Sequence, residues 1–192
     1  MNTIIKQYIT AASLLLLANQ ASAIEFKQVQ ANDSSVTFGY KQMGVALDGK
    51  FGKFSAQVSF DPAKIAQAQA NIEINVASID TGSSDGNDEV VGKLWFNAKT
   101  YPTANFVSTG LKALGGNRYQ ALGKLSIKGK TRDVVAPVTF QSDGTHGIFE
   151  GTFAINRLDY AIGEGEWTDV STVANEIQIK FHVVVNASPS KK

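Results

Sequence analysis

Few side chains in this sequence of 192 residues could carry chemistry. It has two histidines, His146 and His182, and no cysteine. His146 lies beside a turn glycine, and His182 lies on the polar side of an alternating run. Zinc and haem need clustered or axial ligands of the Cys and His type. The sequence therefore predicts no zinc or haem site, no disulfide and no thiol chemistry.

Acidic residues gather in two segments. Asp85, Asn87 and Glu89 could begin a calcium loop, but the sixth position lacks glycine and Phe96 stands at the twelfth. We interpret this segment as a solvated loop whose acids cap a helix.

The second acidic segment could hold a carboxylate pair of the glycosidase type. Its acids are Asp159, Glu164, Glu166 and Asp169. Four acids in one loop are more often its solvated surface. The chain also lacks a Gly-x-Ser-x-Gly nucleophile elbow and a complete dinucleotide-binding glycine motif. We therefore predict that the protein is not an enzyme, with no catalytic residue, metal site or cofactor.

Alternation of apolar and polar residues dominates the rest of the chain. The run VANEIQIKFHVVV, residues 173–185, places its apolar side chains on one face and its polar ones on the other, as a half-buried strand does. About eight such runs occur. The others are residues 34–41, 53–60, 71–78, 104–114, 118–129, 134–141 and 147–157.

Short turns join these runs, which predicts antiparallel neighbours. The predicted turns are residues 47–49, 115–117, 128–130 and 142–144. One apolar face per strand must be covered, either by a second sheet in a sandwich or by closure into a barrel. Because several strands are long, we predict an all-β fold: an extended eight-stranded antiparallel up-and-down barrel, lipocalin-like, with one or two short helices capping it.

Two interruptions are predicted to be helical. Residues 63–70 follow Asp61-Pro62, a helix-start signal. A second helix is expected from Asn87, with Val90, Val91, Leu94 and Trp95 on one face, before Pro102 ends it. This amphipathic helix is a candidate lid for one barrel end. Trp167 is expected either to cover the other end or to anchor a loop.

The chain ends suggest an exported single domain. Residues 1–23 have an early lysine, an apolar run and a small-x-small ending, which predicts a cleaved signal peptide. Residues 24–186 form one domain, and residues 187–192 a flexible tail. Without Lys6 the 18 basic residues become 17, against 17 acidic ones, so the mature chain is formally neutral. We therefore expect no nucleic-acid partner and no membrane span.

Five segments in order resemble the YceI-like family of bacterial secreted proteins. They are FGKFSAQVSFDP, VASIDTG, WFNAKTYPTANFVST, GKLSIKGKTRDVVAPV and FAINRLDYAIGEG. The resemblance implies a lipocalin-like, eight-stranded periplasmic barrel, commonly a homodimer, that holds a polyisoprenoid or similar amphiphile, and a link to isoprenoid quinone metabolism. The sequence departs from the family pattern at residues 40–43, where many members have a histidine, and at residues 86–89, where many have Arg-Asp-x-His. Both departures are expected near the mouth of the barrel, so they affect the prediction of the ligand's head group more than that of the tail-binding interior.

We therefore expect a periplasmic protein that carries or sequesters a long isoprenoid lipid. Inward-facing apolar side chains, with one tryptophan of the capping helix, are expected to line the ligand cavity. They are Phe38, Tyr40, Phe54, Phe60, Ile74, Trp95, Phe106, Ile127, Phe153, Ile177, Ile179 and Phe181. Two alternatives stay open: a filled barrel that only displays loops to a protein partner, and a hydrolase that acts on a bound amphiphile through the acids of residues 159–169.

Overall fold

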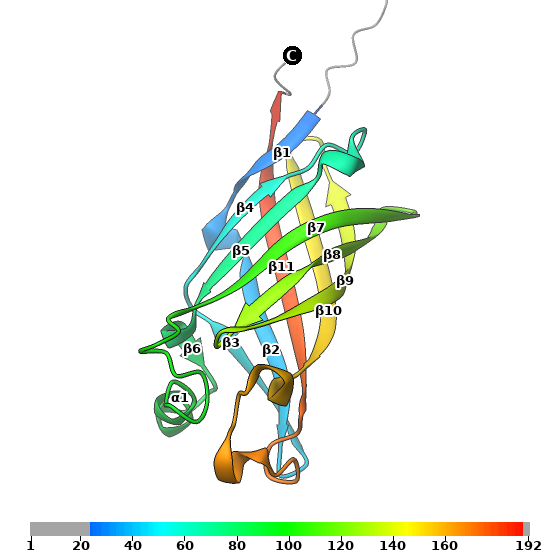
Figure 1. The fold of residues 1–192 in the computed structure, drawn as a ribbon. Coiled ribbons are helices and arrows are strands. Elements are labelled where there is room, and N and C mark those ends of the chain that lie inside the picture. The colour runs from blue at the N-terminus through cyan, green and yellow to red at the C-terminus, as the bar shows by residue number, and fades with distance from the viewer. Residues whose placement is uncertain (1–23, 190–192) are drawn as a thin grey trace, which may run out of the picture.

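The computed structural model describes residues 24–189, so the predicted signal peptide and the last three residues lie outside the described chain. Eleven antiparallel strand segments form one strongly curled sheet in this part of the chain (Figure 1). They are β1 Ile24–Val29, β2 Ser35–Gln42, β3 Val45–Phe51, β4 Phe54–Ser59, β5 Gln69–Asn75, β6 Ile79–Asp80, β7 Thr103–Gly115, β8 Arg118–Ile127, β9 Lys130–Ser142, β10 His146–Asn156 and β11 Glu176–Pro189.

The eleven segments make up eight long strands, because three strands are interrupted. β1 and β2 both pair with β11, on either side of the short 3₁₀ helix η1, Ala31–Asp33. β3 and β4 are separated only by Gly52 and Lys53, and β5 and β6 by the 3₁₀ helix η3, Val76–Ser78. At these interruptions the strand segments exchange partners: β3 pairs with β2 and β6, whereas β4 pairs with β5.

The sheet closes on itself. Each long strand pairs with the next along the chain, and β11 returns to pair with β1 and β2. β1 in turn reaches the end of β4, where Phe26 N donates to Phe60 O at 2.8 Å and Phe60 N donates to Phe26 O at 3.1 Å. The predicted antiparallel lipocalin-like barrel is confirmed. There are eleven segments and not eight only because three of the eight long strands are interrupted. A closed, coiled sheet must bend, and the interruptions provide the bends.

One of the four predicted turns is wrong. Residues 47–49 lie inside β3, and the chain reverses instead at Met43 and Gly44, whose φ angles are 50° and 80°. Gly49 is needed there for another reason, because a Cβ on it would lie 2.3 Å from the Phe38 ring and 2.7 Å from Asp80 O. This glycine does not make a turn; it makes room for an aromatic ring of the neighbouring strand.

Both predicted helices are shorter than expected. The first is reduced to the 3₁₀ helix η2, Ile65–Gln67, because Gln69 and Ala70 already pair with β4. The second, α1, spans Ser84–Val90, and the Ser83 side chain caps it by accepting from Gly86 N at 3.1 Å. Residues 91–102 continue as turns, so Trp95 is not on the helix. Among the described residues no helix is long and apolar enough to cross a membrane.

The predicted tail begins too early. Ala187, Ser188 and Pro189 extend β11 and pair with Phe26, Glu25 and Ile24. The first and last described residues therefore lie together at one end of the barrel, and α1 lies at the other (Figure 1). We call the end with α1 the lower end.

The barrel core has a filled part and a looser part. Near the chain ends the ring of Phe60 lies within 5.6 Å, between centroids, of Tyr119, Phe140 and Phe149. A second cluster at the lower end includes Trp95, Tyr160 and Val76. Between them the inward-facing side chains are only half-buried, as Phe153 and Ile179 are.

Gly49→Ala should destabilise the barrel, because the new methyl group cannot be placed without moving the Phe38 ring or the main chain of Asp80. We expect a loss of about 1–3 kcal/mol in the free energy of unfolding, measured in urea. Gly110→Ala is the matched control, because nothing lies within 4 Å of a Cβ on Gly110. Equal unfolding midpoints for the two variants would contradict this packing argument.

Candidate functional site

The barrel interior contains two apolar cavities. One, of about 180 Å³, lies toward the filled end, and the other, of about 430 Å³, lies toward the lower end. An apolar protein cavity of about 150 Å³ can hold one benzene-sized molecule, so the larger cavity has room for a much longer chain. The two cavities share part of their lining and so adjoin each other. The shared residues are Val36, Ile74, Ala104, Leu125, Phe153 and Ile179.

The structure brings eleven of the twelve predicted site residues to these cavities. Phe60, Phe106 and Phe181 line the smaller cavity, and Ile74, Phe153 and Ile179 line both. The larger one is lined by Phe38, Tyr40, Trp95, Ile127 and Ile177. Phe54 lines neither, although it pairs directly with Ile74. Their contact with a ligand stays a prediction.

Small residues on the inner face do two different things. Ala121 and Ala136 line the smaller cavity and leave space there. Gly123 and Gly151 do not, because a Cβ at either position would lie 2.4 Å from an aromatic ring, that of Phe106 or of Phe181. Gly123 and Gly151 therefore allow the two rings to pack directly against the barrel wall, whereas the alanines leave part of the interior open.

Two segments meet across the lower end of the barrel, and we call them together the end cap: residues 91–102 and 157–175. Leu94 O accepts hydrogen bonds from Gly163 N at 3.0 Å and from Glu164 N at 2.8 Å. The rings of Trp95 and Trp167 lie 5.2 Å apart between centroids. Trp167 thus covers the same barrel end as Trp95. Of the two alternatives predicted for Trp167, covering the opposite end is therefore wrong.

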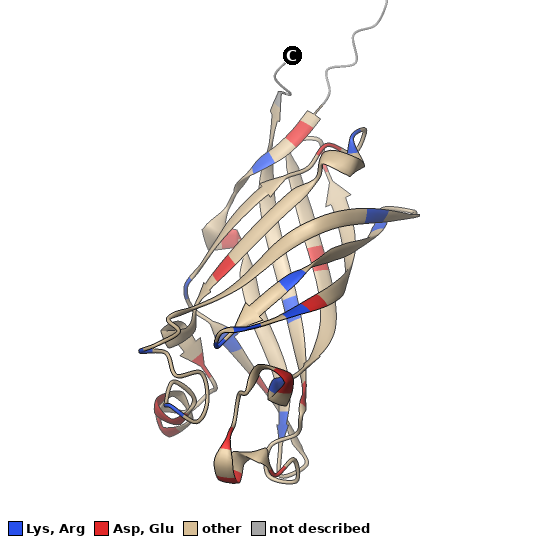
Figure 2. Ribbon diagram, in the orientation of Figure 1, with Lys and Arg blue, Asp and Glu red and all other residues tan. Residues whose placement is uncertain are grey.

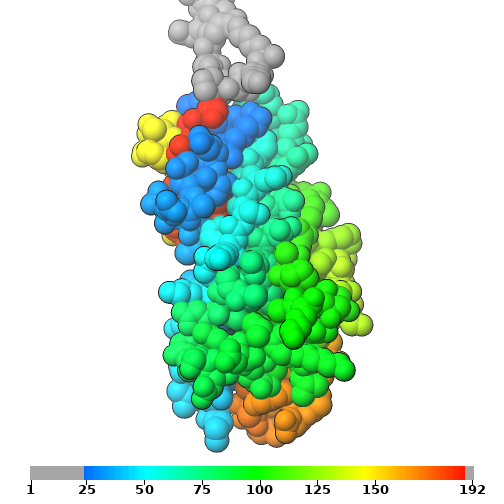
Figure 3. Space-filling view, turned by 90° about the vertical axis from the view of Figure 1, so that its left-hand side faces the viewer, coloured from blue at the N-terminus to red at the C-terminus, as the bar shows by residue number. Residues whose placement is uncertain are grey.

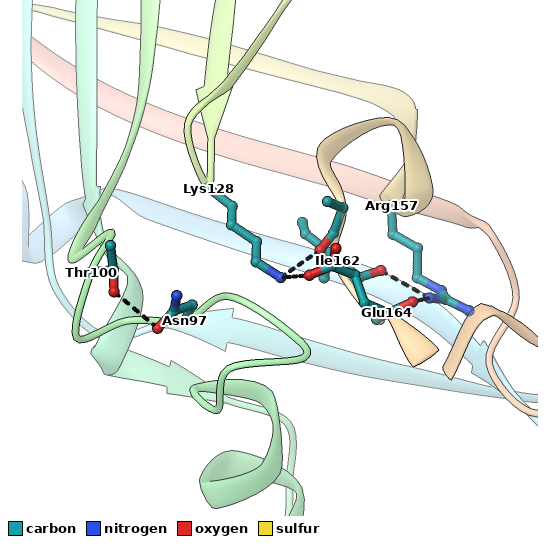
Figure 4. A network of polar contacts seen from close by, with 8 residues as sticks. Asn97, Thr100, Lys128, Arg157, Ile162 and Glu164 are labelled. Atoms are coloured by element: carbon teal, nitrogen blue, oxygen red, sulfur yellow. Dashed lines mark hydrogen bonds and ion pairs between the residues drawn. The ribbon is translucent and has the colours of Figure 1, made fainter. Parts of the chain in front are cut away.

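Arg157 holds the end cap together from inside (Figure 4). Its side chain is 1% exposed, and its guanidinium lies 5.4 Å from the Trp95 ring. All five N–H donors of an arginine are used by main-chain carbonyls. The acceptors are Ala174 O at 3.2 Å, Ile162 O at 2.9 Å, Gly163 O at 3.3 Å, Trp167 O at 2.6 Å and Val173 O at 2.8 Å.

Burial lowers the pKa of Arg157 because desolvation disfavours its charged form. With every donor engaged, Arg157 positions the loop and has no N–H left for a ligand. Sequence reasoning missed it, because an arginine at the end of an alternating strand is ordinarily an exposed charge.

A second polar group ties the end cap to the barrel wall. Lys128, in the β8–β9 turn, donates to Ala161 O and to Glu164 Oε2, both at 2.7 Å (Figure 4). The Lys128 side chain is 6% exposed. The hydrogen bond and charge of Lys128 lower the pKa of Glu164.

The four acids considered as a carboxylate pair do not line either cavity. Glu164 bonds to Lys128, and Asp169 accepts from Ser171 N at 2.8 Å. Within residues 24–189 no group of three or more His, Cys, Asp or Glu side chains could hold a metal ion.

The larger cavity opens between α1 and the β2–β3 hairpin. Gln42, Ser83, Asp85 and Glu89 belong to its lining and are exposed, so they form its mouth. Just inside, Tyr40 donates from its hydroxyl to Thr81 O at 3.2 Å. Burial raises the pKa of Tyr40, so the phenol stays protonated at neutral pH. The mouth coincides with the two segments in which the sequence departs from the family pattern.

A closed antiparallel barrel with an apolar interior and a capped lower end defines the lipocalin-like class. The chain belongs to the YceI-like family, whose profile matches residues 28–185. Among similar solved structures is BcnA from Burkholderia cenocepacia, 51% identical, with a TM-score of 0.80 over 82% of this chain and 99% of that one.

Two further proteins are less similar to this chain. A Photorhabdus laumondii "UPF0312 protein" is 30% identical over 71% of each chain. A domain from Saccharophagus degradans, described as a polyisoprenoid binding domain, is 16% identical, with a TM-score of 0.66 over 85% of this chain and 98% of that one. At that identity the likeness shows the fold alone.

Arg157→Met should unfold the end cap first, because five main-chain carbonyls lose their donor at once. We expect a loss of at least about 2 kcal/mol in the free energy of unfolding, with faster hydrogen exchange in residues 157–175. Arg118→Met is the control, because exposed Arg118 makes one bond of 3.4 Å. If Arg157→Met unfolds like Arg118→Met, the end cap does not depend on this residue.

Glu164→Gln tests the ion pair with Lys128 that joins the end cap to the barrel wall, and the test is how the free energy of unfolding depends on pH. The folded-state pKa of Glu164 is lowered, so its ion pair stabilises the fold above the ordinary glutamate pKa and is lost as pH falls through the lowered value. The wild type should therefore be more stable than the variant at pH 7, and the two should converge in acid. A stability difference that does not change with pH would contradict the ion pair's role.

Proposed function

We propose that this protein binds the apolar chain of an isoprenoid lipid inside its barrel and serves as a periplasmic carrier or sequestering protein. The observation that carries this proposal is the pair of adjoining apolar cavities, with an opening at the lower end. Periplasmic location rests on the predicted signal peptide and on the family's secreted character. The Saccharophagus domain is described as binding the same class of ligand.

Burial of an isoprenoid tail can supply the affinity without polar contacts. Each buried CH₂ contributes roughly 0.8 kcal/mol, so about ten buried carbons give roughly 8 kcal/mol before ordering costs, the scale of a micromolar complex. Aromatic side chains, among them Phe106 and Phe153, and several branched aliphatic ones form the walls. A branched, unsaturated chain fits such irregular walls without any group that reacts with it.

The head group of the lipid is proposed to lie at the lower end, beside Trp95. Trp95 is 6% exposed, and its Nε1 has no hydrogen-bond partner among the described residues. An unpaired buried donor is costly, and a ligand oxygen could remove that cost. A quinone carbonyl or a prenol hydroxyl has the required acceptor. We therefore favour an oxygen-bearing isoprenoid, such as an isoprenoid quinone, over a pure hydrocarbon.

The alternatives have less support. A completely filled barrel would not contain a cavity of about 430 Å³ between its inward-facing side chains. A hydrolase would need its carboxylates beside the ligand, whereas the acids of residues 159–169 point to other partners or solvent. We propose binding without catalysis.

Ala104→Phe tests whether one chain passes through both cavities. Ala104 lines both and is 7% exposed, so a phenyl ring there would fill the junction. Affinity for a long prenol such as solanesol should fall roughly tenfold or more, while farnesol, which needs only the larger cavity, should bind as before. Binding is measured by tryptophan fluorescence.

The control for this experiment is Ala77→Phe, at an exposed position in η3. Denaturation in urea shows whether each variant is folded. Unchanged solanesol binding by a folded Ala104→Phe protein would contradict a chain that spans both cavities.

Trp95→Phe tests the head-group donor. The variant keeps an aromatic ring but loses the N–H, so quinone affinity should fall roughly three- to tenfold, as expected for one hydrogen bond. Binding of squalene, an isoprenoid hydrocarbon without an acceptor oxygen, should not change. Trp167→Phe is the control, and its ratio of quinone to squalene affinity should match the wild type. An equal loss for both ligands in Trp95→Phe would assign Trp95 to packing alone.

A further inference from the structure

The β2–β3 hairpin projects beyond the barrel at the lower end, beside the end cap (Figures 1 and 3). Every residue from 41 to 48 is exposed. Three of them are large and apolar: Met43 is 77% exposed, Val45 60% and Leu47 37%. A hairpin that only closed the barrel would carry polar residues at these positions.

The apolar side chains of the hairpin continue the lining of the larger cavity. Leu47 is directly opposite Tyr40 in the strand register, and Val45 is opposite Gln42. Residues directly opposite in a ladder share one face of the sheet, and Tyr40 and Gln42 line the cavity. Val45 and Leu47 therefore extend its wall outward, past the mouth.

The opposite face of the hairpin is polar. It carries Lys41 and Asp48, and Asp48 pairs with Lys180 Nζ at 3.1 Å. The hairpin is thus amphipathic, with its apolar face turned toward the cavity side and away from this ion pair.

The turn itself has an unfavourable residue. Met43 and Gly44 both have positive φ, 50° and 80°, as in the tight hairpin turns that favour Asn-Gly. Methionine in this conformation is strained, and its side chain is also the most exposed large apolar one in the described chain. Asparagine at this position would be less strained and would make the turn more stable, so the methionine indicates a role at the surface.

A neighbouring segment adds to the same surface. Met43 N donates to Thr172 O at 2.8 Å, which places residues 169–174 against the hairpin tip. Val170 in that segment is 52% exposed. The charged side chains of residues 41–48 and 169–174 are Lys41, Asp48 and Asp169, without a basic cluster. Figure 2 shows blue and red segments interspersed over the molecule.

We propose that the hairpin tip, Met43, Val45 and Leu47 together with Val170, docks on the surface of a lipid bilayer of low net charge. The apolar strip then joins the bilayer to the cavity mouth, so a tail can pass between them without crossing water. The continuity of the strip with the cavity lining argues for this occupant, and the lack of a basic cluster argues against attraction to anionic lipid. The transfer step rests on the proposed function, whereas docking does not.

The test is flotation of the full mature protein with phosphatidylcholine vesicles. The wild type should bind, and binding should not weaken as salt is raised. Met43→Asn combined with Val45→Ser should weaken binding roughly tenfold or more, because two inserted side chains are lost. Val135→Ser, at a 51% exposed position on the outer wall, is the control and should bind like the wild type.

Two further measurements separate a loss of docking from unfolding and from a loss of ligand binding. Met43→Asn alone should raise the melting temperature while weakening flotation, which excludes unfolding as the cause. Farnesol binding in free solution should be the same for the wild type and Met43→Asn, because Met43 lies at the turn and not on the cavity wall. Failure of the wild type to bind farnesol would count against the proposed function only.

Several results would overturn docking. They are failure of the wild type to float, an equal loss in Val135→Ser, and binding that requires anionic lipid and disappears in salt. Sedimentation showing that the hairpin substitutions dissociate a dimer would instead assign this surface to a second copy of the chain.

Discussion

Closure of the barrel is the constraint on which the rest of the structure depends. Once β11 pairs with β1 and β2, the main-chain ladders fix the width of the interior, and eight strands leave just enough room for side chains or for one small ligand. The choice between these outcomes then lies with individual residues. Alanines such as Ala104 and Ala136 leave space, while Phe60 and its aromatic neighbours fill the end near the chain termini.

Closure also creates a problem at the lower end, where the irregular end cap must satisfy its main-chain groups without a sheet. Arg157 solves it by donating to five carbonyls at once from a nearly inaccessible position. A buried cation without a carboxylate partner is costly, and full hydrogen bonding offsets that cost. The end cap can therefore seal an apolar cavity while the mouth between α1 and the hairpin stays open.

Strand identity, antiparallel order and the inward face could be predicted, because alternation with period two records them directly in the sequence. Eleven of the twelve chosen side chains consequently line a cavity. Turn and helix positions were less predictable. Gly49 looks like a turn residue in sequence, yet it accommodates the Phe38 ring across the sheet. The roles of Arg157 and Lys128 depend on loops that meet only in the folded chain, so no local pattern could reveal them.

The most direct test of a hollow, lipid-holding barrel is to identify what the protein carries. The mature protein would be purified from its own compartment without detergent, denatured in organic solvent, and the extract analysed by mass spectrometry against a mock purification. We predict an isoprenoid lipid with an oxygen-bearing head group in stoichiometric amount. An extract that stays empty, even after incubation of the protein with membrane lipids, would contradict the account.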